Sequence, residues 1–194
     1  MRKWCFKFDL STERIKNAFI FAKKCTLSIK SIALQYKIST NTLPTGEYLW
    51  NYNVKDNFYC SRCIESSNDL TVRDNINHSL YSCPNLNLFL TKIFSFLIQE
   101  CKAAVNISEL DYLLGFMDKF ALNSVLLELK KFIFYSYNHN SNIDVQFSMF
   151  IKRLRRLILL EKSHYFSVNK IDYFYKKWEQ FSEVYMFHGP DPIL

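Results

Sequence analysis

Four potential metal ligands lie close together in the sequence and limit what this chain can fold into. Cys60 and Cys63 form a C-x2-C pair, and His78 and Cys83 form an H-x4-C pair. Three cysteines and one histidine at such spacings are typical of structural zinc sites. We therefore predict one structural Zn²⁺, bound by Cys60, Cys63, His78 and Cys83. The alternative is that the three cysteines are ordinary buried thiols.

The composition indicates a helical protein with a hydrophobic core. The chain has 194 residues, of which 49% are hydrophobic, and it contains only three glycines and four prolines. So few turn-forming residues argue against a β-sandwich and favour long helices. We predict an all-α fold, a bundle of about five or six helices around one core, with a small zinc-knuckle lobe.

The chain divides into four predicted segments. Near the N-terminus, basic residues interrupt an apolar pattern of helical spacing, which predicts a helical arm. Ser11 is predicted to cap this arm, and the arm is predicted to break near Thr26 and Ser28. The four segments are a basic helical arm (1–37), a connector with the zinc-binding module (38–84), a C-terminal helical bundle (85–187) and a disordered tail (188–194).

The bundle is predicted from apolar residues that recur at three- and four-residue steps. A capping signature at Ser108 predicts a short helix that ends at Gly115. The longer predicted helices cover residues 85–101, 120–137, 143–166 and 168–185. The predicted core of the bundle contains Leu90, Phe94, Leu126, Ile133, Leu154, Leu157 and Trp178.

Within the zinc-binding module, the spacer between the two ligand pairs (64–77) is polar and is predicted to be a loop. A short helix that ends near Cys83 would present both His78 and Cys83 to the ion. Before the ligands, aromatic residues between positions 48 and 59 are interleaved with asparagines and a lysine. They either pack a small lobe that lacks a core of its own or stack on nucleic-acid bases.

The sequence favours a protein of the cytoplasm or nucleus. The longest apolar run, residues 93–98, is far shorter than a membrane span, and the N-terminal residues lack the apolar core of a signal peptide. Six cysteines in such a chain are better explained as reduced thiols or metal ligands than as disulfides. We therefore expect cytoplasmic or nuclear localisation, with no membrane partner and no small-molecule substrate.

The net charge of +7 favours a partner that carries phosphates. The sequence KRLRR (152–156) places several cations on one predicted helix, and arginine suits phosphate because its guanidinium group contacts two oxygens. The alternative is a solvated helix face, the usual role of a run of charges. The predicted nucleic-acid-binding residues are Lys152, Arg153, Arg155, Arg156, Lys162, Lys176 and Lys177, together with Lys23 and Lys24.

Several stretches resemble the C-terminal region of LINE-type (non-LTR) retrotransposon reverse transcriptases, over roughly residues 30–185. They are QYKISTNTLPTGEYLWNYNVKDNFYCSRC, INHSLYSCPNLNLFL, ISELDYLLGF and LLELKKFIFYSY, followed by a late Trp178. The resemblance implies a cysteine-rich zinc-binding module whose ligand positions match Cys60, Cys63, His78 and Cys83. It also implies binding of element RNA and target DNA during target-primed reverse transcription, with a reverse-transcriptase polymerase domain as a further partner.

Enzymatic motifs are absent from the sequence. The chain contains no Asp-Asp pair, so it lacks the Tyr-x-Asp-Asp motif of the polymerase, and it has no endonuclease constellation. Its histidines lie in no recognisable catalytic motif. We therefore expect a detached, non-catalytic C-terminal module that binds RNA or DNA. The alternative function is a helical protein-interaction domain that docks onto a polymerase or a host factor, without contacting nucleic acid.

Overall fold

The computed structural model describes residues 12–99, 107–116 and 118–182. Over these residues the protein is helical and has no strand, apart from an isolated antiparallel bridge between Tyr59 and Arg73. The all-α prediction is therefore confirmed. The α-helices are α2 (Thr12–Cys25), α3 (Ile29–Ser39), α4 (Gly46–Asn51), α5 (Ser61–Ser67), α6 (Pro84–Gln99), α7 (Glu109–Leu114), α8 (Phe120–Tyr135), α9 (Ile143–Ser167) and α10 (Ile171–Trp178), with a π-helix η1 (His78–Ser82) and a 3-10 helix η2 (Glu179–Phe181).

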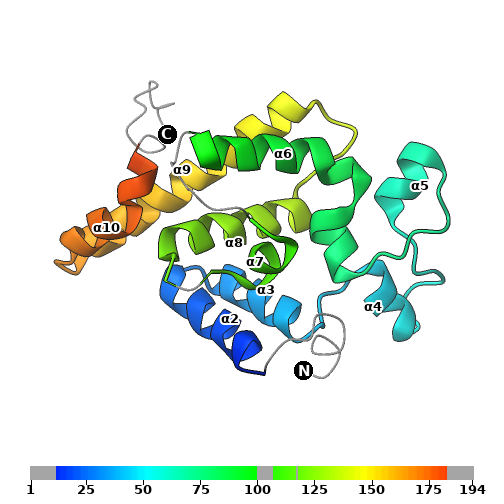
Figure 1. Ribbon diagram of the computed structural model, residues 1–194, viewed down its shortest axis with the longest axis horizontal. Helices are drawn as coiled ribbons and strands as arrows, with labels where there is room; N and C mark the ends of the chain where they lie inside the picture. Colours follow the sequence, from blue (N-terminus) through cyan, green and yellow to red (C-terminus); the bar gives the residue numbers. More distant parts are fainter. Residues whose placement is uncertain (1–11, 100–106, 117, 183–194) are drawn as a thin grey trace.

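Helix α8 lies at the centre of the bundle (Figure 1). All residues from 121 to 130 are buried, because α2, α3, α9, α10 and η1 contact this helix. A helix surrounded in this way can be apolar around most of its circumference. The predicted core is largely confirmed: Leu90, Leu126, Ile133, Leu154 and Trp178 are buried, and Phe94 and Leu157 are partly buried against the same cluster.

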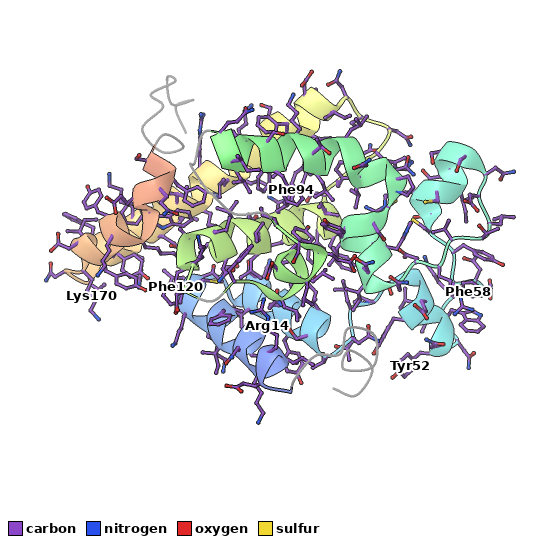
Figure 2. The ribbon with its side chains drawn as sticks, viewed as in Figure 1. Arg14, Tyr52, Phe58, Phe94, Phe120 and Lys170 are labelled. Carbon is purple, nitrogen blue, oxygen red and sulfur yellow. The ribbon has the colours of Figure 1, made fainter. Side chains whose placement is uncertain are left out.

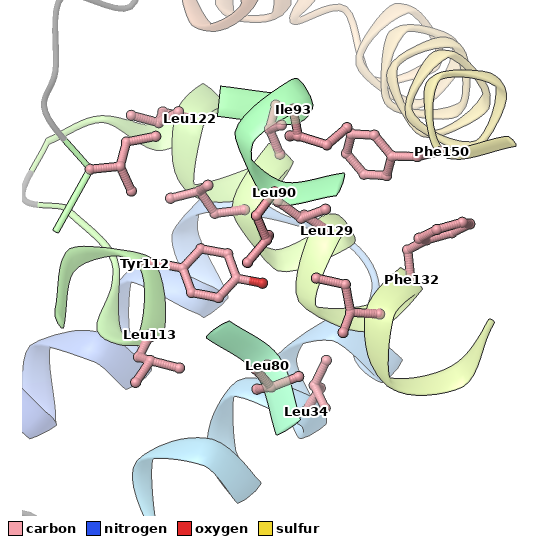
Figure 3. Close-up of a cluster of buried hydrophobic side chains, with 14 of the residues drawn as sticks. Leu34, Leu80, Leu90, Ile93, Tyr112, Leu113, Leu122, Leu129, Phe132 and Phe150 are labelled. Carbon is pink, nitrogen blue, oxygen red and sulfur yellow. The ribbon is translucent and has the colours of Figure 1, made fainter. Parts of the chain in front are cut away.

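One hydrophobic cluster joins residues from the predicted arm, module and bundle. It includes Ile15 of α2, Leu34 of α3 and Leu80 of η1, together with residues of α6 to α10. Figure 3 shows Leu34 and Leu80 near the side chains of α7 and α8. The part that contains α4 and α5 projects from one end of the bundle (Figure 1), and we call residues 45–83 the metal lobe. The predicted boundaries at residues 37 and 84 remain predictions.

Most predicted helix ends agree with the structure where it describes them, but the helix predicted from residue 168 begins at Ile171 and gives way to η2 after Trp178. Ser28 caps α3 after the expected break, and its side chain accepts a hydrogen bond from the N–H of Ser31 at 3.3 Å. Ser108 caps α7 in the same way, and Gly115 ends it with a φ of 90°. Ser11 and the predicted tail (188–194) lie outside the described residues. None of the described helices is both long and apolar enough to cross a bilayer.

The spacer between the ligand pairs is not entirely a loop, contrary to the prediction. Its first residues continue α5, and Asn68 ends this helix in the left-handed conformation with a φ of 53°. Asparagine tolerates this conformation better than most residues, so it can end a helix as glycine does. The short helices α4 and α5, which the sequence did not predict, raise the total above the five or six predicted helices.

Lys130 of α8 is a buried lysine that the sequence analysis did not identify. Its ammonium group donates hydrogen bonds to Oε1 of Gln35 at 2.6 Å and to the carbonyl oxygen of Leu113 at 2.9 Å. Both acceptors are neutral. Burial lowers the pKa of Lys130 to about 7, and the nearby thiol of Cys25 opposes this shift only in part.

We expect the free energy of unfolding to rise as the pH increases from about 7 towards 10.5, the ordinary pKa of lysine. Over this range the unfolded chain keeps the Lys130 proton while the folded protein releases it, so deprotonation favours folding. Below this range both states hold the proton and the contribution stays constant. Urea unfolding at several pH values should show a smaller rise in Lys130→Met, whereas Lys37→Met, at an exposed site, should behave as wild type. An equal rise in all three proteins would contradict this assignment.

Candidate metal centre and basic residues

Cys60, Cys63, His78 and Cys83 lie together, as the sequence predicts. Their donor atoms are all within 4.8 Å of one another, and all four residues are buried. Sγ of Cys63 lies 3.4 Å from Nε2 of His78 and 3.7 Å from Sγ of Cys83. The three cysteines are free thiols. The cluster can therefore hold one metal ion with four protein donors.

Helix α5 presents the first ligand pair. Cys60 is its N-cap residue and Cys63 lies in its first turn. The carbonyl oxygen of Cys60 accepts a hydrogen bond from the N–H of Ile64 at 3.0 Å, which closes that turn. Three residues are nearly one turn of an α-helix, so both sulfur atoms lie on the same side.

The second ligand pair depends on a wide helical turn. The N–H of Cys83 donates a hydrogen bond to the carbonyl oxygen of His78 at 3.1 Å, an i to i+5 bond of the π type. In an α-helix, side chains five residues apart point about 140° away from each other. The wider turn reduces this angle, so both donors face the same point. Pro84 then begins α6, where its missing N–H is tolerated.

The thiols of the cluster affect one another's ionisation. Hydrogen bonding from Cys83, and then from His78, lowers the pKa of Cys60 because these bonds stabilise its thiolate. The same contact raises the pKa of Cys83, and burial raises the pKa of Cys63. Without a cation, the cluster therefore favours one thiolate and two thiols. A bound dication would allow all three to ionise, with release of protons.

Asn85 of α6 attaches α5, the helix that presents Cys60 and Cys63, to the bundle. Its side-chain amide donates to the carbonyl oxygen of Arg62 at 3.1 Å and to Oγ of Ser66 at 2.9 Å, and lies 3.9 Å from Sγ of Cys63. The hydroxyl of Tyr137 donates to the backbone carbonyl of Asn85 at 2.8 Å. Asn85 was not predicted from the sequence, where its only signal is its place two residues after Cys83.

Asp74 connects α4 to the turn that carries His78. Its carboxylate accepts hydrogen bonds from the N–H of Gly46, at 2.7 Å, and from the hydroxyl of Ser79. A Cβ atom on Gly46 would lie 2.9 Å from Cβ of Asp74 and 3.1 Å from the carbonyl oxygen of Tyr59. Glycine is therefore required at the start of α4, because the two segments approach too closely for any side chain.

The aromatic residues of the metal lobe pack against each other but are not all covered. The rings of Trp50 and Phe58 are 5.1 Å apart, those of Phe58 and Tyr59 are 4.6 Å apart, and Arg73 lies 5.0 Å from the Phe58 centroid. Trp50 and Tyr52 remain exposed, and Figure 2 shows Tyr52 and Phe58 at the end of the molecule that the metal lobe forms. These contacts account for Phe58 and Tyr59 as packing residues, while base stacking remains a prediction.

The predicted nucleic-acid-binding residues differ in exposure. Arg153, Arg155, Lys162 and Lys177 are partly buried, and Lys162 lies 5.7 Å from the ring centroid of Tyr175. The residues that are exposed are Lys23, Lys24, Lys152, Arg156 and Lys176. They lie on three helices, α2, α9 and α10.

Lys177 and Arg153 form contacts inside the protein. Nζ of Lys177 lies 2.6 Å from Oε2 of Glu161 and 2.5 Å from the carbonyl oxygen of Cys25, and only 3% of its side chain is exposed. Arg153 donates to Oγ of Ser136 at 2.5 Å and lies 3.5 Å from Oε1 of Glu128. In this arrangement Lys177 offers no exposed charge to a phosphate, and Arg153 offers less than its sequence position suggests.

No protein-family model, curated protein or solved structure matches the chain. The resemblance to LINE-type reverse transcriptases therefore remains a hypothesis. The metal centre and the distribution of charge are therefore two features of the structure that bear on function.

Proposed function

We propose that this protein is a non-catalytic module that binds RNA or DNA and is stabilised by one structural zinc ion. In this proposal it is a detached counterpart of the C-terminal region of LINE-type reverse transcriptases, which it resembles. The metal centre supports the zinc, and the distribution of charge over the surface supports the nucleic acid.

The observation that carries the proposal is the spacing of the donor atoms. Zinc binds sulfur at about 2.3 Å and nitrogen at about 2.0–2.1 Å, so a tetrahedral zinc places two sulfur atoms about 3.8 Å apart and a sulfur and a nitrogen about 3.5 Å apart. The sulfur atoms of Cys63 and Cys83 are 3.7 Å apart, and Cys63 and His78 are 3.4 Å apart. Four protein donors would fill the tetrahedron and leave no open position, which supports a structural rather than a catalytic ion.

The charges of the metal lobe argue against phosphate binding there. The lobe has three basic residues, Lys55, Arg62 and Arg73, against five acidic ones, Glu47, Asp56, Glu65, Asp69 and Asp74. A zinc ion with three thiolates adds a net charge of about −1. The phosphate backbone would therefore be repelled from this end of the molecule, and the zinc would act by supporting the fold.

Helices α2 and α3 are better suited to nucleic acid. Between residues 12 and 40 the only acidic residue is Glu13, and the exposed lysines are Lys16, Lys23, Lys24, Lys30 and Lys37. An extended set of exposed cations with few carboxylates is the electrostatic pattern of phosphate binding, and the carboxylate of Asp111 on α7 is already paired with Arg14 of α2 at 2.8 Å. The exposed cations of α9 and α10 could extend this surface.

Binding to a single-stranded RNA should depend strongly on salt. If about four phosphates are contacted, the affinity should fall about 50-fold between 50 and 200 mM salt, because each contact releases condensed counterions. Fluorescence anisotropy of a labelled oligonucleotide would measure this. Lys23→Gln/Lys24→Gln should reduce the slope of log affinity against log salt by about 1.4, and Lys55→Gln, in the metal lobe, should not. A zinc-loaded, folded protein whose affinity does not change with salt would exclude phosphate binding.

A second candidate function is protein interaction, which the surface of α9 favours. Leu160 and Phe166 of this helix are 61% and 73% exposed. Large apolar side chains gathered on one surface often mark a partner site. The binding assay separates the two functions, because a folded, zinc-loaded protein that binds neither RNA nor DNA would leave protein interaction as the main one.

A further inference from the structure

Helix α9 has an outer side that no other part of the described structure covers. Its inner side contacts α6, α8 and α10. At 3.6 residues per turn, the exposed residues of the outer side fall within about 120° of each other and extend over about 32 Å. We call this surface the outer stripe and define it by Val145, Met149, Lys152, Arg156, Leu160 and Phe166, all exposed; the exposed Ser148, Leu159 and Ser163 lie within the same arc.

The outer stripe is apolar at both ends and cationic in the middle. Val145 and Met149 form one end, and Leu160 and Phe166 form the other. Single exposed apolar residues are common on protein surfaces, but a row of them on one helix is not. Burying both ends against a partner would remove a substantial apolar area from water.

The cations in the middle have no neighbouring carboxylates along the helix. Helix α9 has two acidic residues: Asp144, at its start, pairs with Lys92 of α6, and Glu161 is buried and bound to Lys177. The positive charge of Lys152 and Arg156 is therefore not neutralised by α9 itself. A partner for this surface should be acidic opposite these two residues, because complementary charges favour association.

This order of residues separates the possible partners. A helix that lies on a membrane needs a continuous apolar side flanked by cations, whereas here Lys152 and Arg156 interrupt the apolar side. A nucleic-acid backbone would neutralise the cations but leave the apolar ends exposed. A helix of a partner protein can satisfy both parts, because its side chains recur at the same spacing.

We propose that the outer stripe binds an acidic amphipathic helix of a partner protein. Carboxylates of the partner lie opposite Lys152 and Arg156, and its apolar side chains cover Val145 and Met149 at one end and Leu160 and Phe166 at the other. This inference does not depend on nucleic-acid binding. It gives the protein-interaction function a defined surface and a defined partner chemistry.

The test uses a synthetic helical peptide of about 21 residues, the length that spans the stripe. One side of the peptide carries leucines at both ends and glutamates in the middle, and a second peptide carries lysines in place of the glutamates. The protein variants are Lys152→Glu/Arg156→Glu, with Lys55→Glu/Lys119→Glu, two exposed lysines outside both proposed surfaces, as the charge-matched control. For the apolar ends, the variants are Leu160→Ser and Phe166→Ser. The control is Leu88→Ser, which replaces an exposed leucine on α6.

The acidic peptide should bind wild type, and its Kd should rise about tenfold or more in Lys152→Glu/Arg156→Glu, because like charges then face each other. The lysine peptide should bind that variant better than it binds wild type. Leu160→Ser and Phe166→Ser should weaken the acidic peptide without changing RNA affinity, and the control variants should bind it as wild type does.

Three results would overturn the inference. The first is that wild type does not bind the acidic peptide, or that charge reversal leaves its Kd unchanged. The second is that Leu160→Ser or Phe166→Ser reduces RNA affinity, which would assign the stripe to nucleic acid. The third is that wild type binds phosphatidylserine vesicles through Leu160 and Phe166. If the acidic peptide binds to the protein but RNA does not, the nucleic-acid-binding proposal is rejected and this inference is retained.

Discussion

Replacing Cys63 with serine should reduce the metal content of the purified protein from one zinc per chain to nearly none. The sulfur of Cys63 is close to both His78 and Cys83, so its loss removes one of the two ligands of α5 that contact the other pair. If free zinc is 1,000 times the Kd, zinc binding stabilises the folded protein by about 4 kcal/mol. A loss of this size should lower the melting temperature by about 10 °C in a chain of this length.

Cys25→Ser is the matched control for the zinc experiment. Cys25 is also a buried free thiol, but it lies outside the cluster, and burial raises its pKa to about 11. Its thiol donates to the carbonyl oxygen of Ala22 at 3.6 Å, a bond that a serine hydroxyl can replace. Elemental analysis should therefore find one zinc per chain in Cys25→Ser, as in wild type.

Substitution of zinc by Co²⁺ gives an independent measurement. Wild type and Cys25→Ser should show the visible absorption of tetrahedral cobalt with thiolate ligands, and Cys63→Ser should not. A folded wild-type protein that takes up neither zinc nor cobalt, and that melts at the same temperature as Cys63→Ser, would show that the cysteines are ordinary core thiols.

The second large effect is expected at the buried ion pair of α9 and α10. Lys177→Met should cost about 3–5 kcal/mol of unfolding free energy, because it leaves the carboxylate of Glu161 buried without a counter-charge. The pair is 2.6 Å long, and Nε1 of Trp178 also donates to Glu161, at 3.0 Å. Oε1 of Glu161 has no hydrogen-bond partner in the described structure. Removal of Lys177 therefore leaves Trp178, which donates to Oε2, as the remaining partner of this carboxylate.

The double variant Glu161→Gln/Lys177→Met should recover most of this loss. Neutral side chains of similar size avoid the cost of burying charge, and a glutamine oxygen can still accept the hydrogen bond from Trp178. Lys176→Met, at the exposed neighbouring position, should change stability by less than about 0.5 kcal/mol. Urea unfolding of the four proteins measures these differences. A cost below about 1 kcal/mol for Lys177→Met would show that the pair contributes little to the fold.

The sequence predicted those features that depend on residues close together in the chain. The ligand set could be identified because all four residues lie within one short segment and because zinc accepts few ligand types. The break at Ser28 and the ends of α7 could be identified because a cap requires particular residues within four positions of a helix end. Helix α8 could be identified from the apolar residues that recur at helical spacing along 120–137.

What the sequence could not predict depends on partners far along the chain. Lys177 and Arg153 appear in runs of positive charge, yet Lys177 is buried because Glu161 and Cys25 meet it in the folded protein. Lys130 is buried because Gln35 and the backbone of Leu113 supply its acceptors. Asn85 supports the metal lobe only after α5 and α6 have come together. No local pattern distinguishes these residues from exposed ones.

The carbonyl oxygen of Cys25 has a consequence for the order in which the protein assembles during translation. It accepts hydrogen bonds from Ser124 of α8 and from Lys177 of α10, which is 152 residues further along the chain. At about 5–20 residues per second, α2 leaves the ribosome about 8–30 seconds before α10 can complete this contact. Helix α3 can pack on α2 early in this interval, but the side of α2 that contacts α8 is covered only after α8 has emerged. The ligands from Cys60 to Cys83 can enclose an ion before that, so the nascent chain exposes apolar surface at α2 after the metal site is complete.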